Sequence, residues 1–165
     1  MTNESAKVLA EYLVPQLQQE TATTRKVLAA VPNENLDYKP SEKCMGGLQL
    51  ATHIAAAEIF FLRGVINGEF NWQQPDLKTP AEVVALYDEK VPGLLAEIAA
   101  LPGDKLAKSI KFAIFEMPAV EYLGLSLKHG IHHRGQLSSY LRPMGGKVPS
   151  IYGPSADEGV AGAGA

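Results

Sequence analysis

The chain has 165 residues, of which 46% are hydrophobic and 20% are charged, and its formal net charge is −3. These values are typical of one globular domain and exclude a disordered chain, and the acidic balance argues against a nucleic-acid-binding surface. A single cysteine, Cys44, cannot form an internal disulfide, so we expect a cytoplasmic protein. The first 20 residues include Glu4 and Glu11 and predict neither a secretory signal nor a membrane span.

The N-terminal segment is predicted to be a helix over about residues 4 to 30. Its apolar residues, from Val8 to Val31, recur mostly at spacings of three and four. Pro15 lies inside this segment and removes a backbone donor, so we expect a kink or a later helix start there. Residues 31–47 contain two prolines and two glycines and are predicted to be a long connection.

Two further helices are expected in the middle of the chain. Residues 48–66 are rich in alanine, leucine and isoleucine, contain no proline and form a run too long for a typical strand. After a loop at residues 70–78, the sequence TPAE at 79–82 predicts a helix start with a capping box and a proline at the first helical position. This helix is predicted to end near Leu101, before a Pro-Gly pair.

The remaining chain is predicted to contain one more long helix. The alternation from Leu106 to Phe115 predicts a short extended segment, and the residues from Pro118 to Arg142 are predicted to be helical. Four long helical segments without βαβ alternation predict an all-α fold, a four-helix bundle with one or more long crossover connections. Residues 1–150 are assigned to the bundle and residues 151–165, which end in VAGAGA, to a flexible C-terminal tail.

Polar side chains follow one line along the last predicted helix. Steps of four, three, four, three and four residues separate its members, which are Tyr122, Ser126, His129, His133, Gln136 and Tyr140. The neighbouring line is apolar apart from Arg134, so the polar line borders the buried face. Burying such groups without partners would cost about 1–3 kcal/mol each, so we expect a ligand or a polar network there.

Three histidines are the candidate metal ligands. His129 and His133 are one helical turn apart, a spacing at which two imidazoles can bind one ion, and His53 lies in the otherwise apolar second helix. Three imidazoles would leave coordination positions open for water or substrate, as in catalytic metal sites. The alternative that these histidines bind no metal remains open. Two histidines at i and i+4 of a helix are more often a surface or hydrogen-bonded pair, and a single histidine such as His53 is weaker evidence still. His132 points away and is assigned to packing or solvent.

Three more residues are candidates for supporting roles, and no catalytic residue is assigned. Gln136 and Tyr140 could orient the histidines or be hydrogen-bonding core residues. Arg134 could position a substrate or be a plain ion-pair partner. The chain contains no Glu-x-x-His pair and no HExxH sequence, so neither a di-iron carboxylate site nor the common zinc-protease site is expected.

Two segments resemble signatures of the DinB-like superfamily. HGIHHRGQLSSYLRPMGGKVPSIYG, at residues 129–153, resembles the C-terminal signature, in which His-x-x-x-His-Arg-Gly-Gln leads to Leu-Arg, a glycine-containing turn and a segment with proline and Tyr-Gly. GGLQLATHIAAAEIFF, at residues 46–61, resembles the second helix of that family, in which a histidine precedes a glutamate by a few residues. The family often has serine before this helix, where this chain has Gly46-Gly47, which puts helix capping there in doubt.

The resemblance implies a four-helix bundle whose histidine triad, here His53, His129 and His133, binds nickel or zinc, and it implies a homodimer. Characterised branches of the family use low-molecular-weight thiols as transferases or isomerases. We therefore expect a metal-dependent enzyme, a thiol transferase or hydrolase, that activates a thiol or water as nucleophile and acts on a small molecule, with a thiol as cosubstrate. The alternatives are a non-catalytic, stress-associated metal-binding protein and a helical interaction module without metal. Neither a nucleic acid nor a membrane is an expected partner.

Overall fold

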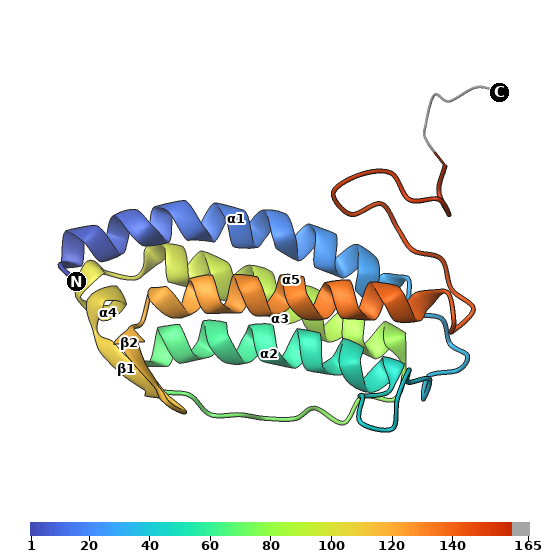
Figure 1. Cartoon of the computed structure of the whole chain (residues 1–165). Helices are drawn as coiled ribbons and strands as arrows, with labels where there is room; N and C mark the ends of the chain where they lie inside the picture. The colour runs from blue at the N-terminus through green and yellow to red at the C-terminus, as the bar shows by residue number, and fades with distance from the viewer. Residues whose placement is uncertain (160–165) are drawn as a thin grey trace.

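The computed structural model describes residues 1–159, and within them four long helices form a bundle (Figure 1). The long helices are α1 (Asn3–Ala29), α2 (Gly47–Asn67), α3 (Pro80–Ala100) and α5 (Glu121–Leu141). A short helix, α4 (Gly103–Ala107), and an antiparallel hairpin of β1 (Ser109–Phe112) and β2 (Phe115–Pro118) connect α3 to α5. The predicted all-α bundle is therefore confirmed.

The order of the helices in the bundle requires one long crossover. α1 and α2 each pack against both α3 and α5, and α2 and α3 run in the same direction, antiparallel to α1 and α5 (Figure 1). Two parallel neighbours cannot be joined by a short turn, so the chain between α2 and α3 returns along the bundle. A 21-residue helix is about 31 Å long, and the twelve residues from Gly68 to Thr79 reach about 40 Å when extended. This crossover covers one side of α2.

α2 forms much of the core and carries one of the candidate ligands. Fifteen of its 21 residues are buried. It is long and apolar enough to cross a membrane, but 78% of its apolar window lies inside the bundle, as expected of a core helix. Gly46 offers no side-chain cap, and the N–H groups of Gly47 and Leu48 instead donate to the carbonyls of Tyr38 and Leu36. The preceding connection thus fixes the start of α2.

Three predicted elements differ in detail from the structure. α1 is helical on both sides of Pro15, so no later start occurs there. The segment 106–115 is divided between the end of α4 and the hairpin, whose turn places Ala113 at φ 53. The last helix begins at Glu121 instead of Pro118, because Pro118 pairs with Ser109 at the end of the hairpin.

An ion pair between the buried Arg134 and the partly buried Glu20 joins α5 to α1. Arg134 is 1% exposed, and its Nη1 lies 2.5 Å from the carboxylate of Glu20 and donates to the hydroxyl of Thr24 at 3.2 Å. The Tyr152 hydroxyl accepts from Arg134 and donates to Glu20 at 2.7 Å, and its ring centroid lies 5.1 Å from the guanidinium carbon. The charge of Arg134 is therefore compensated inside the protein.

The segment assigned to a flexible tail is partly fixed to the bundle. Besides Tyr152, Asp157 accepts from Arg142 at 2.9 Å and from the backbone N–H of Val148 at 2.8 Å. Residues 151–159 thus fold back onto the helices, and residues 160–165 of the predicted tail lie outside the described residues.

Replacing Glu20 by Gln is expected to destabilise the protein by about 2–4 kcal/mol, because the buried guanidinium of Arg134 would lose its counter-ion. Urea denaturation measures this change. Asp88→Asn is the matched control, since it removes the carboxylate of the exposed ion pair between Asp88 and Arg25. Its stability should stay close to that of the wild type. Equal losses in the two variants would contradict this assignment.

Candidate metal centre

Three histidine side chains meet between α2 and α5. His53 comes from α2, and His129 and His133 come from successive turns of α5. One ring nitrogen from each residue lies within 4.8 Å of the other two, and the ring centroids are separated by 4.4 to 5.1 Å. The fold therefore brings together the three residues that the sequence analysis selected, although 76 positions separate His53 from His129.

The spacing and the donor atoms of this cluster fit a divalent transition metal. Nε2 of His53 and Nε2 of His129 are 3.3 Å apart. Two imidazole nitrogens bound to one ion at about 2.0–2.1 Å are about 2.8–3.4 Å from each other in octahedral or tetrahedral geometry. Within residues 1–159 the cluster includes no carboxylate or thiol. Three imidazoles suit ions such as zinc and nickel and leave part of the coordination sphere open.

Burial favours the neutral form of two of these imidazoles. Desolvation lowers the pKa of His53, and His133 lowers it further. The pKa of His129 is lowered to about 4, first by desolvation and then by the neighbouring imidazoles. Both side chains are therefore neutral at pH 7, and each has a nitrogen lone pair available for a metal ion.

Gln136 and Tyr140 continue from His133 along α5. Nδ1 of His133 lies 3.0 Å from Oε1 of Gln136, and Nε2 of Gln136 donates to the Tyr140 hydroxyl at 3.2 Å. Because Oε1 can only accept, this contact places a proton on Nδ1 of His133 and leaves Nε2 as the free nitrogen. Tyr140 is buried and contacts the imidazole through Gln136.

Arg134 and His132 lie outside the cluster. The side chain of Arg134 is directed to α1, where Glu20 and Thr24 hold it. The structure thus shows the ion-pair alternative for Arg134, and it does not support the substrate-positioning role. His132 is exposed, as expected, but it does not point away from the cluster, because its ring centroid lies 4.8 Å from that of His133.

Two aromatic side chains that the sequence analysis did not select border the histidines. The ring centroid of Trp72 lies 5.9 Å from that of His53, and the Phe61 centroid lies 5.6 Å from that of His129. Trp72 belongs to the crossover and is 43% exposed, and the three histidines are partly buried. The sequence feature that could have indicated Trp72 is that it is the only tryptophan and lies in a polar loop.

Glu58, the glutamate that follows His53 in the second signature, is not part of the histidine cluster. It is buried, and it accepts hydrogen bonds from the hydroxyls of Tyr87 at 2.6 Å and Thr21 at 3.1 Å. Desolvation raises the pKa of Glu58. Its contacts join α2 to α3 and α1, so its role in this structure is to connect helices.

Comparison with known proteins places this architecture in a family. The model of the DinB family matches residues 1–160. The chain belongs to the DinB family. Among curated DinB relatives, Bacillus subtilis YrdA is 29% identical over 147 residues, which cover 84% of this chain and 85% of YrdA. Bacillus subtilis YjoA is 26% identical over 126 residues, which cover 74% of this chain and 82% of YjoA.

Solved structures share the DinB fold with this chain. A DinB-like protein from Bacillus cereus ATCC 10987 aligns with a TM-score of 0.73 and 23% identity, over 86% of this chain and 97% of that one. YjoA aligns with a TM-score of 0.70 and 23% identity, over 87% of this chain and 99% of YjoA. A mycothiol-dependent maleylpyruvate isomerase aligns with a TM-score of 0.52 and 16% identity, over 92% of this chain and 65% of the isomerase. At these identities the structures show the fold alone.

Replacing Gln136 by Leu is expected to weaken nickel binding by about 10-fold to 100-fold, because His133 would lose the partner that fixes its ring and its proton. Titration against a competing chelator measures the affinity. Ser139→Ala serves as the control, since its exposed hydroxyl contacts only the backbone carbonyl of Gln136. The orienting role of Gln136 is refuted by equal affinities in the two variants.

Proposed function

We propose that this DinB-family protein binds one divalent transition metal ion, nickel or zinc, through His53, His129 and His133, and that it is an enzyme activating a small nucleophile. The nucleophile is a low-molecular-weight thiol or water. The observation that carries this proposal is the cluster of three imidazoles, to which residues 1–159 add no fourth histidine, cysteine, aspartate or glutamate donor. Zinc and nickel bind at least four ligands, so such a centre retains a place for a small molecule.

The residues around the cluster support a reactive centre. A bound divalent ion would supply Lewis acidity, which lowers the pKa of a coordinated thiol or water toward neutral pH. Burial favours neutral His53 and His129, and Gln136 holds the His133 ring and its proton. Phe61 and Trp72 pack beside the imidazoles, and the three histidines are themselves only partly buried.

A thiol is the proposed cosubstrate on two grounds. Thiolates are strong ligands of zinc and strong nucleophiles near neutral pH. The maleylpyruvate isomerase whose fold this chain shares is mycothiol-dependent. We place the protein in the cytoplasm, where low-molecular-weight thiols are kept reduced.

The remaining candidate is a metal-binding bundle protein without catalysis, in which the ion would only stabilise the fold.

The proposal is tested first by the metal content of the purified protein and of the triple variant His53→Ala, His129→Ala, His133→Ala. We expect about one nickel or zinc ion per chain in the wild type and none in the triple variant. His132→Ala is the matched control, because it removes an exposed histidine next to the cluster and should keep the metal. Wild-type protein that takes up neither ion would overturn the whole proposal.

The second test is thiol consumption by the metal-loaded protein. Cysteine, glutathione and mycothiol are each combined with a panel of electrophiles, and loss of free thiol is followed over time. The wild type and His132→Ala should consume thiol, and the metal-free protein and the triple variant should not. A fully loaded protein that neither consumes thiol nor hydrolyses the panel would favour the non-catalytic alternative.

We further propose that the protein is a homodimer in solution through an apolar surface on α1. Val8 and Tyr12 are 60% and 68% exposed and lie one helical turn apart. Light scattering should give twice the chain mass of 17.7 kDa. The double variant Val8→Glu, Tyr12→Glu should be a monomer, because four carboxylates would meet in the interface. A wild-type monomer, or a variant that stays dimeric, would contradict this surface.

A further inference from the structure

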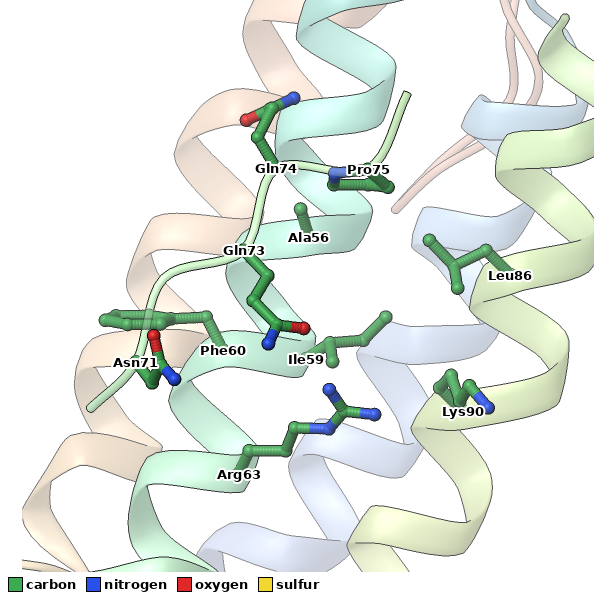
Figure 2. A pocket seen from close by; sticks show the side chains of 10 residues that line it. All are labelled: Ala56, Ile59, Phe60, Arg63, Asn71, Gln73, Gln74, Pro75, Leu86 and Lys90. Atoms are coloured by element: carbon green, nitrogen blue, oxygen red, sulfur yellow. The ribbon is translucent and has the colours of Figure 1, made fainter. Parts of the chain in front are cut away.

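A recess lies between α2 and α3, under the crossover that carries Trp72 (Figure 2). Its cavity volume is about 200 Å³. Liquid water occupies about 30 Å³ per molecule, so the recess is equivalent to about seven waters and accommodates a ligand of up to about ten non-hydrogen atoms. A ligand that fits inside this recess must therefore be a small molecule.

The floor of the recess is apolar. Ile59 and Phe60 come from α2, and Leu86 faces them from α3. Figure 2 shows the amide of Gln73 extending from the crossover over Ile59. The crossover is held in place nearby, because Phe70 packs directly over Gly64, where an added Cβ would lie 2.0 Å from the Phe70 ring. The recess is thus built from two rigid helices and an anchored segment.

Two cationic side chains border this apolar floor. Arg63 extends from α2 with its guanidinium turned toward α3, and Lys90 comes from α3 (Figure 2). Arg63 takes part in no ion pair among residues 1–159, and Lys90 pairs only with the exposed Glu89 beside it in the chain. Among the described residues that line the recess, none is acidic. The recess therefore presents the unpaired guanidinium of Arg63, and the ammonium of Lys90 with its exposed partner, next to hydrocarbon surface.

We propose that this recess binds a small organic carboxylate, with its carboxylate between Arg63 and Lys90 and its hydrocarbon part on Ile59, Phe60 and Leu86. A guanidinium matches a carboxylate with two parallel N–H donors, and an ammonium adds a point charge. Inorganic phosphate satisfies the cations but leaves the apolar floor uncovered, so a carboxylate with a short hydrocarbon part fits the lining better.

The recess is separate from the metal centre. None of the three histidines lines it. Trp72 contacts Phe60, which lines the recess, with centroids 5.3 Å apart, and it contacts His53 at 5.9 Å. Binding here requires no metal, so this inference stands independently of the proposed function. Trp72 is the only tryptophan in the chain, so its fluorescence reports changes at the crossover.

The test is calorimetric titration of the full-length protein, stripped of metal with a chelator, with butyrate, crotonate and benzoate. At least one of the three should bind with a dissociation constant below about 10 mM and should change the fluorescence of Trp72. Arg63→Gln and Lys90→Gln should each weaken binding at least about fivefold, because each removes a charge-assisted contact. Lys43→Gln, which removes an exposed lysine that does not line the recess, should bind as the wild type does.

Two further probes define the ligand class. Benzamide keeps the shape of benzoate without its charge, and inorganic phosphate keeps negative charge without hydrocarbon. Both should bind at least about fivefold more weakly than the best carboxylate. The proposal is overturned if none of the three carboxylates binds, if both charge variants bind as tightly as the wild type, or if either probe matches the best carboxylate. Because the protein carries no metal in this test, its failure would not affect the proposed metal centre. A failure to find metal at the histidines would likewise not affect the proposed carboxylate site.

Discussion

Three imidazole rings lie against one another between α2 and α5 without a carboxylate among them. Two Nε2 atoms that face each other at 3.3 Å can share at most one proton when both rings are neutral, and protonating both would bring two like charges together in a half-buried place. Desolvation, followed by the neighbouring imidazoles, lowers the pKa values of His53 and His129 and favours the neutral rings. A divalent cation satisfies all three lone pairs at once, and for this reason the metal hypothesis rests on electrostatics as well as on spacing.

Polar contacts outside the histidine cluster fix the helices that carry it. Arg134 is only one residue from His133, yet its charge is compensated by Glu20 on α1 and by Tyr152 from the C-terminal segment. The buried carboxyl group of Glu58 accepts hydrogen bonds from hydroxyl groups of α3 and α1. These buried polar contacts join the helices that carry the histidines to the opposite side of the bundle. Because a buried charge without its partner is costly, they favour one arrangement of the helices over others.

The crossover between α2 and α3 links the fold to its two candidate sites. The crossover is needed because α2 and α3 run in the same direction. Its path along α2 places Trp72 beside His53, and it places Gln73 over the recess between α2 and α3. Function in this protein would therefore depend on a segment without regular secondary structure, held by the contact of Phe70 with Gly64. Loops on a rigid scaffold commonly have this role.

The sequence was sufficient to predict the helices and the histidines, since both depend on local spacing. A period of three and four residues marks the long helices, and the i, i+4 pair His129 and His133 needs only the geometry of one helix. His53 was a candidate because it is a histidine in an otherwise apolar helix, and the family resemblance strengthened its pairing with the other two, since no local pattern specifies which helices meet. The surroundings of the site could not be predicted for the same reason. Trp72 reaches His53 through the crossover path, and Arg134 is turned toward Glu20, 114 positions away in the chain.

The central claim is that the three histidines form a metal site. Anomalous diffraction from crystals grown with nickel, recorded on both sides of the nickel absorption edge, tests this claim most directly. The account predicts one strong peak per chain about 2.0–2.2 Å from a nitrogen of each of His53, His129 and His133. An absent peak at the cluster, or a peak bound only by surface groups elsewhere, would contradict it.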